Sequence, residues 1–157
     1  MTKNYITSVN GIELIPINNL VKESFFIPAY QRGYRWKHPE VTDLLDDIWE
    51  FSLTAQPIEF YCLQPIVVKN KGTEWEVIDG QQRLTTIFII LNFLKKKCYT
   101  ISFETRIGSQ SFLNDIDMTV RNDNIDYFHI CEALESVETW FSKMENSNSC
   151  AGRKWMF

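Results

Sequence analysis

VIDGQQRLTT, residues 77–86, decides the fold, because it joins a strand-like run to a helix-like run. TEWEVI, residues 73–78, is rich in β-branched and aromatic residues, which favours a strand. From Leu84 to Leu94 apolar residues recur at helical spacing and also fill the other faces, which predicts a helix buried nearly all round. A plain turn has no use for an aspartate, two glutamines and an arginine, so the junction predicts a binding site.

A strand, a tight polar turn and a buried helix together form an anion site, because the first helical N–H groups are unpaired and the dipole is positive there. Gly80 can let a ligand approach the backbone, Arg83 can fork onto phosphate oxygens, and Gln81 or Gln82 can orient a water or a base edge. Alternatively, Asp79 caps the helix, Gly80 is a turn residue and Arg83 pairs with a carboxylate. Spacing alone leaves both interpretations open.

A second polar segment, IPAYQRGYRW, occupies residues 27–36. It belongs to the stretch FFIPAYQRGYRW, residues 25–36, where Pro28 and Gly33 exclude a continuous helix and predict an ordered loop. Aromatic rings alternate there with polar groups that can stack on bases and bind phosphates. These candidate residues for nucleic-acid binding or base stacking are Tyr30, Gln31, Arg32, Tyr34, Arg35 and Trp36. Alternatively, Tyr30 and Trp36 anchor the loop to the core and both arginines are solvated, which composition alone favours.

The other elements follow from periodicity and turn residues, and together they predict an α/β (α+β) fold with a small mixed sheet flanked by helices and a C-terminal helical extension. We expect strands at 11–17, 60–69, 73–78 and 99–106, with a hairpin turn at 69–72, and helices at 17–24, from Pro39 to before Pro57, and from Ser109. Asn122 or Asn124 can cap a final amphipathic helix.

Composition limits the function classes. The chain has 157 residues and is 45% hydrophobic, which fits one globular domain. A net charge of -4 argues against bulk attraction to nucleic acid, so any DNA contact must be local. The four cysteines lack zinc-site spacing and are expected to be buried thiols. No signal peptide or bilayer-length apolar run is visible, so we predict a cytoplasmic protein without a membrane span.

Taken together, IPAYQRGYRW followed by VIDGQQRLTT resembles the N-terminal domain of the GmrSD-type, modification-dependent restriction proteins, a bacterial family with a ParB/sulfiredoxin-like fold. The resemblance extends to about residue 145, because FYCLQPIVV, ETRIGSQSFL and IDYFHICEALESVETWF are similar to further family segments. One departure is the stretch 63–65, Leu-Gln-Pro, where many members have Leu-Gly, so the backbone there is less able to approach a ligand.

The resemblance implies a nucleoside-triphosphate-binding and hydrolysing regulatory domain of a restriction, or phage-defence, system, with Mg²⁺ as cofactor. It also implies DNA, possibly modified, and a nuclease domain or subunit of the His-Asn-His type as partners, and we allow for a homo-oligomer. The expected division is a nucleotide-binding domain at 1–108, a helical extension at 109–145, and an unstructured tail or the truncated start of a missing region at 146–157.

The same resemblance suggests roles for individual residues. Asp79 is assigned to the metal or to motif ordering, Gln82 to water placement, and Arg83 with Arg32 to transition-state charge. The expected nucleotide contacts are Gly80, the Gln81 backbone, Arg83, Thr85, Arg32 and Arg106. Arg106 ends a probable strand, and it reaches the same crevice as the turn if the two strands are parallel. The alternative is a surface arginine paired with Glu104 or Asp115. For the site role, we expect Arg106→Ala to weaken nucleotide binding or hydrolysis about tenfold or more and to leave stability within about 0.5 kcal/mol.

A competing hypothesis is a non-enzymatic module that reads modified DNA through the YQRGYRW loop, with DGQQR holding a DNA phosphate. A third hypothesis, that this chain is itself the nuclease, has little support. The acidic residues of the helix after Pro39 and the two histidines, His38 and His129, form no recognisable catalytic or metal set.

Overall fold

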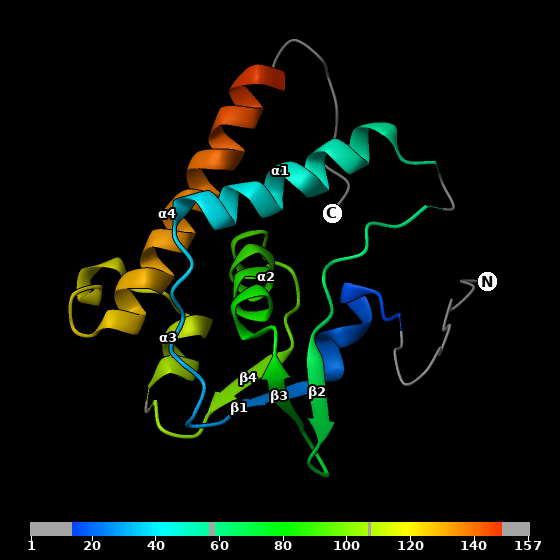
Figure 1. Ribbon diagram of the computed structural model, residues 1–157. Coiled ribbons are helices and arrows are strands. Elements are labelled where there is room, and N and C mark those ends of the chain that lie inside the picture. The colour runs from blue at the N-terminus through cyan, green and yellow to red at the C-terminus, as the bar shows by residue number, and fades with distance from the viewer. Residues whose placement is uncertain (1–13, 57–58, 107, 149–157) are drawn as a thin grey trace.

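The structure is a computed structural model that describes residues 14–56, 59–106 and 108–148. Its elements, in chain order, are η1 (Ile17–Lys22), β1 (Ser24–Ile27), α1 (His38–Thr54), β2 (Val67–Asn70), β3 (Trp75–Asp79), α2 (Gln81–Phe93), β4 (Thr100–Phe103), α3 (Ser109–Asn114), η2 (Met118–Val120) and α4 (Ile125–Asn148). In Figure 1, α2 lies between the sheet and the two long helices, α1 and α4. This is the predicted α/β arrangement of a small mixed sheet with flanking helices and a long C-terminal helix.

The sheet has the strand order β2-β3-β1-β4. β1 pairs in parallel with both β3 and β4, whereas β2 forms an antiparallel hairpin with β3. The carboxyl ends of β1, β3 and β4 therefore lie at one edge of the sheet, which is where ligands gather in open α/β sheets. We expected Arg106 to reach the turn if the strand before it ran parallel to the strand before the turn. These two strands are β4 and β3, and both are parallel to β1, so they run in the same direction.

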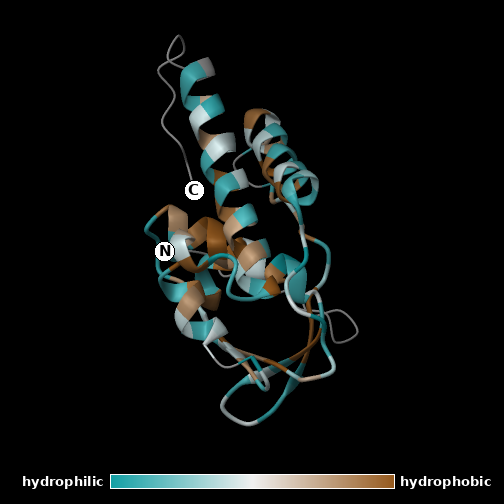
Figure 2. Ribbon diagram, turned by 90° about the vertical axis from the view of Figure 1, so that its left-hand side faces the viewer, coloured by the Kyte–Doolittle hydropathy of each residue, from teal (hydrophilic) through white to brown (hydrophobic). Residues whose placement is uncertain are grey.

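A single hydrophobic core fills the space between the sheet and the helices. Every residue from Leu84 to Ile90 of α2 is buried, which confirms the prediction of a helix buried nearly all round. On the sheet, Ile27 and Val77 are 0% exposed, and α4 contributes Val137, also 0% exposed, to the same core. The brown, apolar segments in Figure 2 accordingly gather between the strands and the outer helices.

The largest error of the sequence analysis is β1. We predicted an ordered loop from Phe25 onward, but Ser24–Ile27 is a strand at the centre of the sheet, with alternate residues buried, and Pro28 follows its last residue. Four residues are too few to show a clear period of two, and their pairing with distant strands is invisible in the sequence.

Other boundaries also changed. The strand expected at 60–69 is reduced to β2, because its partner β3 is itself only 5 residues long. The strand expected at 99–106 is reduced to β4. Residues 14–16 form no strand, and the rest of the strand expected at 11–17 lies in η1 or outside the described residues.

Asn124, and not Asn122, caps α4. Its Oδ1 accepts the backbone N–H groups of Asp126 at 3.0 Å and Tyr127 at 2.9 Å. The helix then continues to Asn148, so the first three residues of the tail expected at 146–157 are helical and the remainder lies outside the described residues.

The three cysteines in the described residues differ in burial. Cys131 is buried, Cys98 is half-buried and Cys62 is exposed, so the expectation of buried thiols holds only in part; Cys150 lies outside the described residues. Burial raises the pKa of the Cys131 thiol above its ordinary value. Among the described residues, no helix has the length and apolar character needed to cross a bilayer.

We predict that Asn124→Ala lowers the free energy of unfolding by about 1 kcal/mol, because two N–H groups at the start of α4 lose their acceptor. Urea unfolding followed by circular dichroism measures the change. Asn122→Ala is the matched control, since Asn122 is exposed and precedes the cap. Equal stability of the two variants would contradict the assignment of the cap.

Candidate functional site

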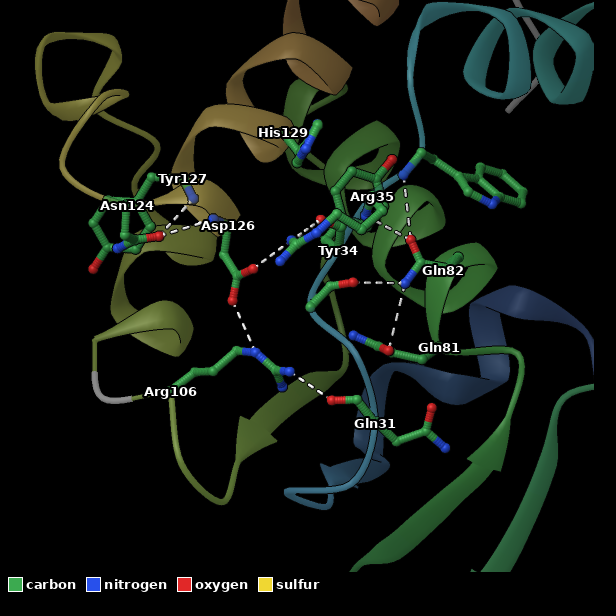
Figure 3. A network of polar contacts seen from close by, with 12 residues as sticks. Gln31, Tyr34, Arg35, Gln81, Gln82, Arg106, Asn124, Asp126, Tyr127 and His129 are labelled. Carbon is green, nitrogen blue, oxygen red and sulfur yellow. Dashed lines mark hydrogen bonds and ion pairs between the residues drawn. The ribbon is translucent and has the colours of Figure 1, made fainter.

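The candidate site lies where β1, β3 and β4 end. The Gln31 side chain donates from Nε2 to the carbonyl of Ile78 at 2.7 Å, which ties the loop after β1 to the end of β3. The Gln31 carbonyl in turn accepts a hydrogen bond from Arg106 Nη2 at 2.6 Å. The two motifs and the arginine selected from the sequence are therefore in one contact network (Figure 3).

Gln82, in the first turn of α2, anchors the loop. Its Oε1 accepts the backbone N–H groups of Arg35 at 2.7 Å and Trp36 at 3.3 Å, and its Nε2 donates to the carbonyl of Gly33 at 3.0 Å. Both ends of the amide are thus engaged with the loop backbone. The sequence assigned Gln82 to water placement, which would require these bonds to break; its observed contacts give it a positioning role.

Asp126, near the start of α4, joins two arginines. Its carboxylate contacts two guanidinium groups (Figure 3). The distances are 2.6 Å to Arg35 Nη1 and 2.8 Å to Arg106 Nε, and the residue is only 9% exposed. Two guanidinium groups share one carboxylate, so this group of three carries a net charge of about +1 at neutral pH. The sequence analysis missed Asp126, because an aspartate in the first turn of a helix is adequately explained by the helix dipole.

Arg106 is therefore not the surface arginine expected as the alternative, and its carboxylate partner is neither Glu104 nor Asp115. Its side chain is 18% exposed and pairs with Asp126. Removing it leaves the Asp126 carboxylate with one arginine fewer, so we now expect its loss to lower stability by more than the change of about 0.5 kcal/mol expected of a surface residue.

Arg83 contacts only uncharged acceptors in the described part of the chain. Its Nη1 donates to Oε1 of Gln64, and its Nη2 donates to the carbonyl of Pro65 at 2.8 Å. The alternative interpretation, that Arg83 pairs with a carboxylate, does not hold among these residues. Arg32 of the loop is exposed.

Gly80 forms the N-cap of α2 in a left-handed conformation, with φ of 92°, and no side chain caps the helix. The alternative in which Asp79 is the cap is therefore wrong. A Cβ at Gly80 would lie 3.1 Å from the Cα of Ile66. The close approach that we expected a ligand to make on this side is made by Ile66 instead. The first N–H groups of α2 still have no carbonyl one turn earlier to bond.

The aromatic residues of the loop separate into two groups. Tyr34 is 2% exposed and its hydroxyl lies 2.8 Å from Thr86 Oγ1, so the base-stacking role predicted for Tyr34 is wrong. Burial raises the pKa of the Tyr34 phenol well above its ordinary value, which keeps the group neutral. Trp36 is half-buried and packs against the core, whereas Tyr30 is 67% exposed. The anchoring interpretation therefore holds for Trp36 but is wrong for Tyr30, which is accessible for stacking. Its solvated arginines are also only partly observed, because Arg32 is exposed whereas Arg35 pairs with Asp126.

Unmet hydrogen-bonding capacity is concentrated in residues that the sequence selected. Among the described residues, the buried side-chain polar atoms without a partner are Gln81 Nε2, Arg83 Nε, Thr85 Oγ1 and Arg106 Nη1. Native proteins leave few such atoms, and functional sites are one place where they occur. Thr85 is 0% exposed, so its predicted direct contact with a ligand is not offered by this conformation.

A metal ion would need groups beyond those that the chain supplies. The described residues contain no cluster of three or more His, Cys, Asp or Glu side chains that could hold one. Mg²⁺ is often bound by one or two carboxylates together with substrate phosphates. Asp79, exposed at the end of β3, fits such a shared site but not an independent metal centre.

Residues of the DGQQR turn line neither of two surface hollows of the structure. One hollow is lined by His38 and Ser136, and the other by Asn92 and Asp115, among other residues.

The fold and the site define a small α/β domain with a polar strand-to-helix turn at the carboxyl edge of its sheet. Residues 16–153 match the family model described as the GmrSD restriction endonuclease, N-terminal domain. The match covers most of the chain, which therefore belongs to this family, as the two motifs predicted. We found no match to the chain among curated proteins or among solved structures.

We predict that Gly33→Ala lowers the free energy of unfolding by about 2 to 3 kcal/mol through overpacking. A Cβ at Gly33 would lie 1.9 Å from Asp126 Oδ1, so the ion pairs of Asp126 would have to shift. Thermal and urea unfolding measure the loss, with Thr73→Ala on the exposed hairpin turn as a control expected to stay within about 0.5 kcal/mol. A Gly33→Ala protein as stable as the control would show that the Asp126 carboxylate does not lie against Gly33.

Proposed function

We propose that this domain binds a nucleoside triphosphate with Mg²⁺ at the first turn of α2, and that occupancy or hydrolysis of the nucleotide controls the nuclease component of a DNA restriction system. The observation that carries the proposal is the coincidence of unmet polar atoms with residues of the DGQQR turn and with Arg106. Membership of a restriction endonuclease family supports the DNA and nuclease part of the proposal.

Charge supports an anionic ligand. The two positive charges of Arg35 and Arg106 exceed the one negative charge of Asp126, and among the described residues Arg83 contacts only uncharged acceptors. Hydrogen bonds between a guanidinium and phosphate are about twice as strong as neutral ones, and they can be bidentate. The positive end of the α2 dipole adds to this attraction.

In this proposal, different residues of the site bind the phosphates, share the Mg²⁺ and position the loop. Arg83 and the first N–H groups of α2 would bind phosphate oxygens, and Arg106 Nη1 would donate to a further one. Asp79 would share the Mg²⁺, which neutralises phosphate charge when bound. Gln31 and Gln82 hold the loop against β3 and α2, so that these groups keep their relative positions.

We predict that Arg83→Ala weakens binding at least tenfold, which corresponds to about 1.4 kcal/mol. Titration calorimetry with the four ribonucleoside triphosphates and Mg²⁺ is the measurement. Arg121→Ala, which removes the same charge from a pair with Glu135, is the control and should bind as the wild type does. Absence of binding to wild type at millimolar nucleotide would refute the proposal.

In the same titration we expect Arg106→Ala to weaken nucleotide binding at least tenfold, which again corresponds to about 1.4 kcal/mol. Arg106→Lys keeps a positive charge near Asp126 but lacks the planar fork, so it limits the loss of stability. Unchanged affinity and turnover in this folded variant would remove Arg106 from the site.

A second candidate function rests on Tyr30, because a tyrosine that is 67% exposed beside the exposed Arg32 can stack on an unpaired base. In this case the loop binds modified DNA without nucleotide, and binding falls steeply as salt is raised. Gel shifts on modified and unmodified duplexes, with wild type and Tyr30→Ala, distinguish this function. A shift that is absent, or insensitive to salt and to Tyr30→Ala, would count against it.

A further inference from the structure

We propose that the short segment Gln64-Pro65 is a built-in competitor for Arg83, so that the chain itself lowers the affinity of the turn for phosphate. The inference rests on the proposed function and concerns regulation of that same site. It begins from one fact: both terminal nitrogens of the Arg83 guanidinium, the pair that would bind two phosphate oxygens, are already used by Gln64 Oε1 and the carbonyl of Pro65.

The contact can be exchanged for a phosphate because its acceptors are uncharged and lie at the surface. Gln64 and Pro65 are both exposed. A hydrogen bond between neutral groups contributes about 0.5 to 1.5 kcal/mol, and one to a charged group about 1.5 to 3 kcal/mol, so an oxyanion with two charged oxygens is the stronger partner for the guanidinium. The contact therefore weakens binding of an anion without preventing it.

The backbone around the segment permits such an exchange. Residues 59–66 form no helix or strand, which leaves Gln64 outside the hydrogen-bond ladder of the sheet. Ile66, which follows this segment, packs against the hydrophobic core, and its Cα lies 3.1 Å from the position that a Gly80 Cβ would take. We infer that Gln64 and Pro65 move away from Arg83 while Ile66 stays in place, so the turn keeps its conformation when the anion binds.

The experiment uses tripolyphosphate with Mg²⁺ as the probe, since it carries the phosphate chain without a base. We expect Gln64→Ala to bind it about threefold to tenfold more tightly, because one competing acceptor is removed. We expect Gln64→Glu, which offers Arg83 a carboxylate of the same size, to bind it at least tenfold more weakly. The matched controls are Gln56→Ala and Gln56→Glu, at an exposed glutamine after α1, and both should bind as the wild type does.

A double-variant comparison tests whether Gln64 acts through Arg83. In an Arg83→Ala background, the Gln64→Ala gain should disappear, because the contact no longer exists. If Gln64→Ala binds tripolyphosphate as wild type does, while Arg83→Ala binds it more weakly, the competitor is refuted and the proposed function stands. If wild type binds neither tripolyphosphate nor any of the four nucleotides, both are refuted. A Gln64→Ala gain that persists without Arg83 would also refute the competitor.

Discussion

The structure depends on the parallel pairing of β1 with strands on both of its sides. Because β1 is bonded to β3 and to β4 in the same direction, three strand ends and the segments after them reach one edge of the sheet. The aromatic loop, the DGQQR turn and Arg106 are far apart in the sequence, yet this pairing brings them into contact. A different order of strands would leave each of them as an isolated polar segment.

Side chains then fix what the strands bring together. The Gln82 side chain forms hydrogen bonds with the backbone of the loop, and Asp126 forms an ion pair with Arg35 of the loop. The loop is therefore anchored to both α2 and α4. Buried pairs of this kind contribute little net stability compared with apolar packing, but removing one partner lowers the free energy of unfolding strongly, because it leaves a buried charge unpaired. We interpret Gln82 and Asp126 as residues that set the geometry of the edge. Among the described residues, Arg83 and Arg106 each keep one buried guanidinium nitrogen without a hydrogen-bond partner.

The sequence predicted those parts of the fold that local patterns determine. The helices α1, α2 and α4 and the β2-β3 hairpin follow from periodicity and turn residues, and the family follows from the two motifs. β1 could not be predicted, because a four-residue strand is defined by its partners and not by its own pattern. For the same reason Asp126 was missed and Tyr34 was placed at the surface. A buried ion pair and a buried ring are properties of long-range packing, which one sequence does not reveal.

The central claim is that the first turn of α2 is a phosphate site, and a crystal structure with a non-hydrolysable nucleoside triphosphate and Mg²⁺ tests it most directly. The account predicts phosphate oxygens within hydrogen-bond distance of the first N–H groups of α2 and of the Arg83 guanidinium, with Gln82 still holding the loop. A nucleotide bound elsewhere on the chain, with Arg83 still hydrogen-bonded to Gln64, would contradict it.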